Sequence, residues 1–349
     1  MNYQLHFVNV KVKGFQVPRL RRHLYLIALT LVLGSWIIYM TNTHQWSLFT
    51  EFWPMSLTMA LGSFVAGSTP QGGAAVAFPV FTKALHIPTA DSRTFGLMIQ
   101  SIGMIMASIL IVARGVKVLP RVIAFVSIGA VLGMILGTYV TIIPNPYPRI
   151  LFTLGATSFA VALIISRWVL KWTPRPDLPT WNWHYRLLFI LVGVAGGIFA
   201  AHTGSGADML TFIVLTLAFG VDEKISVPTT VIIMGLNSVV GFFLHGAVSH
   251  DIGIVWHYWL VAVPVVAVGA PLGAFAASLV KREVIILFVL FLIAAEMITT
   301  ILLIPFTSIM LTVTGLVIGF SAVSFFVMLT YRQRYLATSF TQKNIQQNA

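Results

Sequence analysis

Residues 67–73 read Gly-Ser-Thr-Pro-Gln-Gly-Gly, and residues 201–207 read Ala-His-Thr-Gly-Ser-Gly-Ala. Both stretches separate apolar runs that are short for a membrane span. Thr69 and Thr203 are 134 residues apart, and the same separation joins several other pairs of one residue type. These pairs are Gly62 and Gly196, Gly72 and Gly206, Phe78 and Phe212, and Ser92 and Ser226. We interpret the two stretches as matching parts of an internal duplication.

The composition predicts an all-α, polytopic membrane protein. The 349 residues are 58% hydrophobic and 9% charged, with a mean hydropathy of +0.93, whereas soluble domains carry roughly 25% charged residues. The net charge of +12 does not indicate nucleic acid as a partner, because Lys and Arg gather beside apolar spans. The chain has no cysteine, which excludes disulfides and thiolate metal sites. We expect no cofactor.

Twelve apolar segments are predicted. They are 24–40, 52–67, 74–86, 94–113, 120–142, 149–170, 186–201, 207–219, 228–246, 254–279, 284–303 and 308–331. The four segments that flank the two quoted stretches are shorter than the roughly 20 residues of a spanning helix. They are therefore predicted to be short broken or re-entrant helices.

Basic residues predict the orientation of the chain. They cluster in the connections 11–22, 114–121, 167–175 and 281–282 and after the last span, all on one predicted side. The positive-inside bias makes that side the cytoplasm of a cell inner (plasma) membrane and leaves both termini cytoplasmic. Because five matched spans open each half, the second copy is predicted to be inverted relative to the first, as in alternating-access transporters.

The same pattern predicts the domain organisation. A basic cytoplasmic segment precedes an extra transmembrane helix, and a cytoplasmic linker separates the two repeats before a cytoplasmic tail. In chain order these parts are 1–23, 24–40, the first repeat 52–170, the linker 171–185, the second repeat 186–331 and the tail 332–349.

The two breaks are predicted to form the functional site. Non-helical backbone at membrane depth persists only inside the protein or beside a watery cavity. The N–H groups at 72–74 and 206–208 open helices, and helix N-termini attract anions. A small anion is therefore the expected ligand. The alternative is that these glycines only let helices pack closely.

The duplicated break resembles the sulfite exporter TauE/SafE family, also called the TSUP family. The resemblance lies in the Gly-rich break and the apolar run Gly72-Gly-Ala-Ala-Val-Ala-Phe-Pro79, followed by a short amphipathic loop and a helix start with Ser or Thr, and it extends from about residue 55 to 331. It implies transport of sulfur-containing anions such as sulfite, thiosulfate or small organosulfonates, often as export. The second copy departs from the pattern at His202 and Asp208, which stand where the first has Ser68 and Ala74.

Neutral polar groups are expected to hold the anion, because no Lys or Arg lies at a predicted span centre. The candidate substrate-binding residues are Thr69, Gln71, Gly72, Gly73, Gln100, His202, Thr203, Ser205, Gly206 and Asn237. Arg93 and Lys224, in the predicted loops after the short helices, could attract anions electrostatically or simply be solvated.

Three ionisable residues are candidates for proton coupling: Asp208, His202 and Glu296. Carboxylates inside a membrane are costly and are functional by default. Asp208 either caps the helix that it opens or carries a proton that an adjacent anion would help it to retain. His202 could contact the anion or only pack between helices, and Glu296 is expected to be mainly structural.

Other functions fit the sequence less well. His245, His250, Asp251 and His257 lie together in the sequence, but their spacing fits no compact metal site. Gly204-Ser205-Gly206 faintly resembles an intramembrane serine protease, although Thr203 stands where that pattern requires glycine. We therefore predict no enzymatic activity. A passive anion channel and a carboxylate transporter stay open as alternatives, and the oligomeric state does not follow from the sequence.

Overall fold

The computed structural model describes residues 19–69, 71–169, 175–178, 181–279 and 282–347. Most of the predicted basic segment 1–23 and part of the linker 171–185 lie outside these ranges. Helices dominate the described part, in which nine are long and apolar enough to cross a membrane. The all-α, polytopic membrane fold is therefore confirmed.

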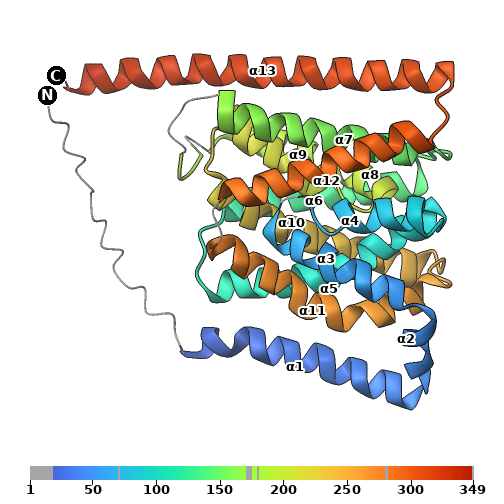
Figure 1. Ribbon diagram of the computed structural model, residues 1–349. Helices are drawn as coiled ribbons and strands as arrows, with labels where there is room; N and C mark the ends of the chain where they lie inside the picture. Colours follow the sequence, from blue (N-terminus) through green and yellow to red (C-terminus); the bar gives the residue numbers. More distant parts are fainter. Residues whose placement is uncertain (1–18, 70, 170–174, 179–180, 280–281, 348–349) are drawn as a thin grey trace, which may run out of the picture.

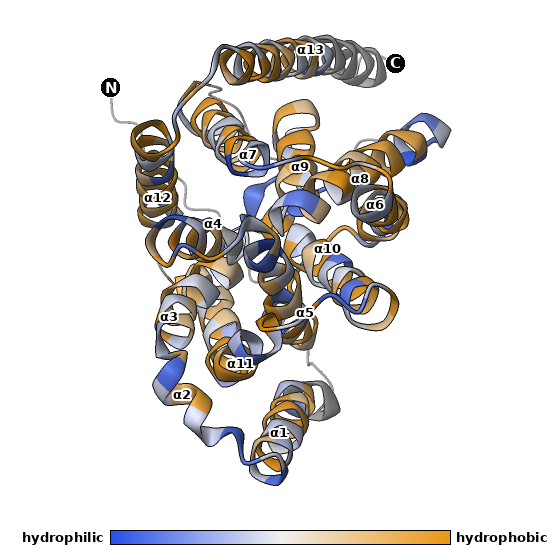
Figure 2. Cartoon of the chain, turned by 90° about the vertical axis from the view of Figure 1, so that its right-hand side faces the viewer, coloured by the Kyte–Doolittle hydropathy of each residue, from blue (hydrophilic) through white to orange (hydrophobic). Residues whose placement is uncertain are grey.

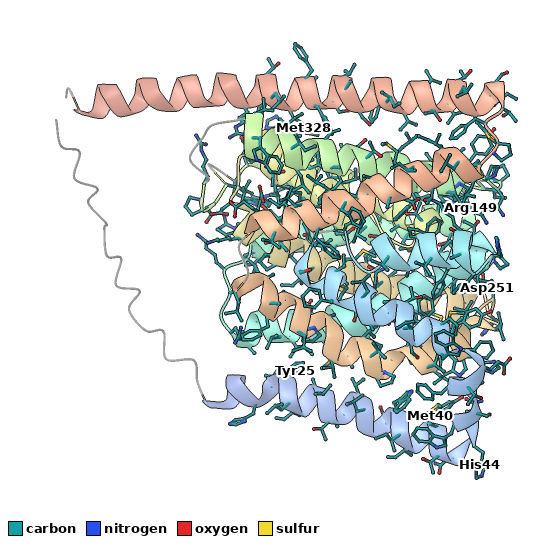
Figure 3. All side chains as sticks on the ribbon, in the orientation of Figure 1. Tyr25, Met40, His44, Arg149, Asp251 and Met328 are labelled. Atoms are coloured by element: carbon teal, nitrogen blue, oxygen red, sulfur yellow. The ribbon has the colours of Figure 1, made fainter. Side chains whose placement is uncertain are left out.

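The helices run between two ends of one bundle (Figure 1). We call one end, where α1 (Arg19–Asn42) begins and α13 (Ser308–Gln347) ends, the basic face. The other end, with the connections that contain His44, His86 and His250, is the histidine face; Figure 3 labels His44, Arg149 and Asp251 there. Figure 2 looks onto this face and shows α1 and α13 at opposite edges of the bundle.

The first break lies in a re-entrant hairpin. Helix α3 (Trp53–Ser68) enters from the histidine face after η1 (Gln45–Ser47) and α2 (Leu48–Glu51), and Ser56 Oγ donates to Val261 O over 2.7 Å. After the break, α4 (Ala74–Pro79) and the π-helical turn η2 (Val80–Ala84) lead back to the same face. There Arg149 donates to Thr89 Oγ1 over 3.1 Å.

The second break lies in a hairpin that enters from the basic face. Helix α8 (Trp183–Thr203) leads inward, and α9 (Ala207–Ile213) with the π-helical turn η4 (Val214–Ala218) leads back. At the returning end, Arg175 N–H donates to Gly220 O over 2.9 Å. Helix α8 has 21 residues, so the expectation that the segment at 186–201 is short was wrong: the helix continues beyond both predicted ends.

Four long helices surround the hairpins: α5 (Thr89–Ala113), α6 (Pro120–Tyr139), α10 (Glu223–Phe243), extended by η5 (Leu244–Val248), and α11 (Val255–Leu279). Helix α3 packs against α11, α8 against α6, and α5 against α10. In the predicted duplication α3 corresponds to α8, and α6 corresponds to α11. The contact of α3 with α11 therefore corresponds to the contact of α8 with α6. This reciprocal packing is what the predicted inverted repeat requires, although the duplication itself stays a prediction.

Glycines make the two reciprocal contacts possible. A side chain on Gly133 of α6 would overlap the carbonyl group of Val194 in α8. In the same way, a side chain on Gly273 of α11 would overlap the carbonyl group of Phe64 in α3. Because backbones touch directly at these points, both hairpins are held tightly by the other half of the chain.

The remaining helices lie outside this core. Helix α7 (Tyr147–Ile164), extended by η3 (Ile165–Val169), packs against α12 (Arg282–Leu303). Residues 308–332 of helix α13 are mostly exposed, and the helix continues to Gln347, so residues 332–347 of the predicted tail prolong it. Helix α1 likewise begins before the predicted residue 24.

Candidate functional site

The two breaks meet inside the bundle. Ser205 Oγ of the second break donates to Gln71 O of the first over 3.3 Å. Gln71 is 1% exposed and Ser205 is fully buried. Two segments that enter from opposite faces thus touch at one polar point, which we call the junction: Gln71, Gly72, Gln100, Ser205 and Asp208.

Gly72 is the most constrained residue of the junction. Its φ of +68° lies in the left-handed region that favours glycine. A Cβ atom at this position would lie 2.7 Å from Gln100 Oε1, 3.3 Å from Asp208 Oδ2 and 3.4 Å from Ser205 Oγ. Gly72 therefore lets three polar groups of other elements approach the first break.

Gln100 ties the central helix α5 to the second break. Its amide nitrogen donates to Gly204 O over 2.8 Å and to Gly96 O over 2.9 Å. Because both amide hydrogens are used in this way, Gln100 Oε1 faces Gly72 as an acceptor, and it has no hydrogen-bond partner among the described residues. The position of this oxygen is fixed by the donors at the other end of the amide.

Asp208 caps the second break. Its Oδ1 accepts a hydrogen bond from Gly206 N–H over 3.0 Å, and both carboxylate oxygens lie 3.2 Å from Ser205 Oγ. The side chain is fully buried. The carboxylate thus occupies the position that we predicted for an anion at this helix start. The capping role is present, and it leaves Oδ2 facing Gly72 and Gln100.

The two matched threonines hold the ends of the helices that precede the breaks. Thr69 Oγ1 donates to Val65 O over 3.0 Å, and Thr203 Oγ1 donates to Phe199 O over 2.9 Å and to Ser205 O over 2.7 Å. Both hydroxyl hydrogens are directed to the backbone. These residues shape the breaks and have only acceptor capacity left for a ligand.

Two predicted site residues make no hydrogen bond to the junction within the described part of the chain. His202 Nε2 lies 2.8 Å from Thr141 Oγ1, which follows α6 at the histidine face. Asn237 of α10 is 2% exposed, and neither amide atom has a hydrogen-bond partner there. The remaining candidate, Gly73, has an ordinary helical φ of −69° beside Met59 and Gly62.

Lys83 was missed as a buried cation. It lies in η2, and its Nζ is 2.6 Å from Glu296 Oε2 and within 3.0 Å of Thr299 and Thr300 Oγ1. Glu296 Oε1 also accepts from Thr153 Oγ1 over 2.9 Å. The prediction that no Lys or Arg lies at a span centre did not cover Lys83, which stands near the end of the predicted segment 74–86, and its partner lies more than 200 residues away in the sequence.

Arg93 and Lys224 lie in the first turns of α5 and α10, not in loops. The expected loop positions were wrong, because each helix begins earlier than its apolar run. Lys224 is exposed, whereas Arg93 is half-buried and its buried Nε has no hydrogen-bond partner in the described ranges.

The histidines at the histidine face form one short contact. His245 Nδ1 lies 2.9 Å from Asp251 Oδ1. Within the residues that the structure describes, no group of three or more His, Cys, Asp or Glu side chains is placed to hold a metal ion.

Within the described ranges, nine apolar helices and a buried junction between two hairpins define a multi-pass membrane protein. Residues 55–300 match the model of a family described as sulfite exporter TauE/SafE. The match spans more than half of the chain, and the chain belongs to this family. It is therefore a membrane transporter and not an enzyme. Comparisons with curated proteins and with solved structures gave no match.

Proposed function

We propose that the protein is a secondary transporter that exports small sulfur-containing anions, such as sulfite, thiosulfate or organosulfonates, by alternating access around the junction. The hydrogen bond from Ser205 to Gln71 O supports this proposal most directly, because it joins hairpins that enter from opposite faces. A site reached from both faces through two broken helices is the usual arrangement in such transporters. The family description favours sulfur oxyanions over other anions.

The first break is the better anion-binding end of the junction. Asp208 already accepts the Gly206 N–H group at the second break, so this helix start repels a second negative charge. The matching position of the first break is Ala74, and Gly73 precedes it. We therefore assign the anion to the first break, with Gln71, Gly72 and Gly73 around it and the Ser205 hydroxyl across from it.

Asp208 and Gln100 support proton coupling. A Cβ atom on Gly72 would lie 2.7 Å from Gln100 Oε1 and 3.3 Å from Asp208 Oδ2, so both oxygens lie near one position beside Gly72. Two acceptors that converge in a buried place repel each other unless one of them carries a proton. A protonated Asp208 would remove the charge that opposes an anion. The proton and the anion would then bind together.

His202 and Glu296 are weaker candidates for the coupling site. Glu296 is held by Lys83 and Thr153, and His202 contacts Thr141. These contacts support structural roles for both residues. We place the coupling proton on Asp208.

Flux measurements test this function. Purified protein in proteoliposomes should carry sulfite, thiosulfate and sulfoacetate in a saturable manner, faster with an imposed pH gradient. Saturable flux that the gradient does not change would remove the proton coupling and keep the carrier. Flux of acetate alone would identify a carboxylate transporter.

The same vesicles distinguish a carrier from a channel. A carrier keeps a steep substrate gradient when the membrane potential is clamped by a potassium ionophore, because its two gates do not open together. Rapid collapse of the gradient would identify a passive anion channel and overturn alternating access.

A further inference from the structure

A second group of buried polar atoms lies at the histidine face, outside the junction. His245 is 1% exposed, and its Nε2 has no hydrogen-bond partner in the described ranges. The Nε atom of Arg93 is buried and equally without a partner there. Buried donors and acceptors are nearly always paired in native proteins, so two orphaned atoms in one place call for a ligand.

The packing of α5 against α10 brings these two residues together. A Cβ atom on Gly235 would touch Met104, and one on Gly241 would touch Leu97. The helices are therefore antiparallel, and one further turn toward the histidine face places Arg93 opposite His245. The second break adjoins the same turn, since a Cβ atom on Gly204 would lie 3.0 Å from Arg93 O.

The two orphaned atoms are one donor and one acceptor. His245 Nδ1 contacts Asp251 Oδ1 and Oδ2 at 2.9 and 3.1 Å, so the ring proton lies on Nδ1 and Nε2 is left as an acceptor. Arg93 is near enough to His202, His245 and Asp251 to interact with them electrostatically, and its Nε–H is a donor. A guanidinium group binds oxyanions through several aligned N–H donors.

We infer that Arg93 and His245 form a second oxyanion site at the histidine face, which the transported anion occupies before or after the junction. This inference rests on the proposed transport function and extends it. The oxyanion accepts from Arg93 Nε–H, and a singly protonated oxyanion such as hydrogen sulfite donates its O–H group to His245 Nε2. The adjoining second break connects this site to Ser205 and the junction.

The matching positions in the other half of the chain are apolar. The residues that match Arg93 and His245 at the 134-residue separation are Val227 and Ile111. Both belong to one apolar cluster with Met104 and Met234. The oxyanion site is thus one-sided, and it should affect transport differently from the two faces.

The test compares initial rates of sulfite flux with the anion presented at either face, in right-side-out and inverted vesicles. Arg93→Gln should raise the KM at the histidine face about tenfold, the effect of losing one charge-assisted hydrogen bond, and leave the KM at the basic face within about twofold. Arg93→Lys should give an intermediate value, because it keeps the charge and loses the Nε–H donor. His245→Gln should raise the same KM by about threefold. Lys224→Gln, which removes an exposed cation at the matching helix start of α10, is the control.

Titration calorimetry of detergent-purified protein with sulfite separates the possible failures. Loss of one of two binding events in Arg93→Gln, with the KM change above, supports the inference. Wild-type flux with an unchanged KM in Arg93→Gln and His245→Gln overturns it and leaves the transport function standing. Absence of wild-type flux for every sulfur anion overturns the transport function and, with it, this inference.

Discussion

The two breaks have matching sequences but different chemistry. The first has Gly73 and Ala74 at its helix start, neither of which carries a polar side chain, whereas the second has Ala207 and Asp208, whose carboxylate accepts from Gly206 N–H. Duplication supplies two equivalent backbones, and one substitution at a helix start then decides which of them receives an anion. In our proposal the first break holds the anion and the second holds the proton.

The hairpins are also held differently. The first is attached to α12 through the buried pair of Lys83 and Glu296. At the 134-residue separation from Lys83 stands Leu217, which packs in an apolar cluster with Phe159 and Ala162 of α7. A directional charge pair thus holds the first hairpin at this position, and apolar packing holds the matching position of the second.

Breaking the charge pair should give the largest effect. Glu296→Gln leaves the Lys83 charge buried without a counter-charge, which should cost about 3–5 kcal/mol of stability. Thermal unfolding in detergent measures this loss. Lys83→Met combined with Glu296→Leu removes both charges and should recover most of it. If the single variant unfolds like wild type, the pair does not hold the first hairpin.

Gly72→Ala should have the next largest effect. The left-handed backbone and the close approach of Gln100 together should cost about 2–4 kcal/mol and abolish most of the flux. Gly73→Ala is the matched control, because its φ is ordinary and the nearest atom to its Cβ would be 3.4 Å away. Equal flux in the two variants would show that the first break is only a packing contact.

Asp208→Asn should separate proton coupling from transport. The amide still accepts from Gly206 N–H and Ser205 and cannot carry the proton, so stability should fall by about 1 kcal/mol or less. Sulfite flux should lose its response to an imposed pH gradient. A variant that keeps the wild-type response would move the coupling site away from the second break and reduce Asp208 to a cap.

Ser205→Ala should have the smallest effect. It removes one hydroxyl donor, which Gln71 O and the Asp208 carboxylate share, and one such hydrogen bond is worth about 1 kcal/mol. We expect a KM raised by about threefold to tenfold with stability little changed. The matching substitution Gln71→Ala removes a side chain without altering the main-chain oxygen. If Gln71→Ala raises the KM as much as Ser205→Ala does, the side chain of Gln71 also contacts the anion.

Local patterns in the sequence predicted most of the fold. Hydropathy is a property of neighbouring residues, so it identified nearly every membrane helix and both breaks. It placed helix ends less well: α8 begins at Trp183 and ends at Thr203, because polar and aromatic residues at a membrane surface continue a helix beyond its apolar run. The family assignment followed from the first break and its apolar run, and it is confirmed for residues 55–300.

The candidate site was predicted in part. Gln71, Gly72, Gln100, Ser205 and Asp208 do come together, and their types and spacing had indicated them. Lys83 and the position of Arg93 were missed, since nothing adjacent in the sequence indicates a partner for either. A charged residue within a predicted apolar segment, such as Lys83 in 74–86, is the signal that could have identified a buried charge.

The sequence by itself therefore determined that the chain lies in a membrane, where its helices and the two breaks fall, and which family it belongs to. Each of these depends on the composition and order of nearby residues. The tertiary structure decided which groups meet: Ser205 with Gln71, Lys83 with Glu296, and α5 with α10 at the histidine face. These contacts join residues more than 100 positions apart. They depend on how glycine-lined helices pack in three dimensions, which no local pattern records.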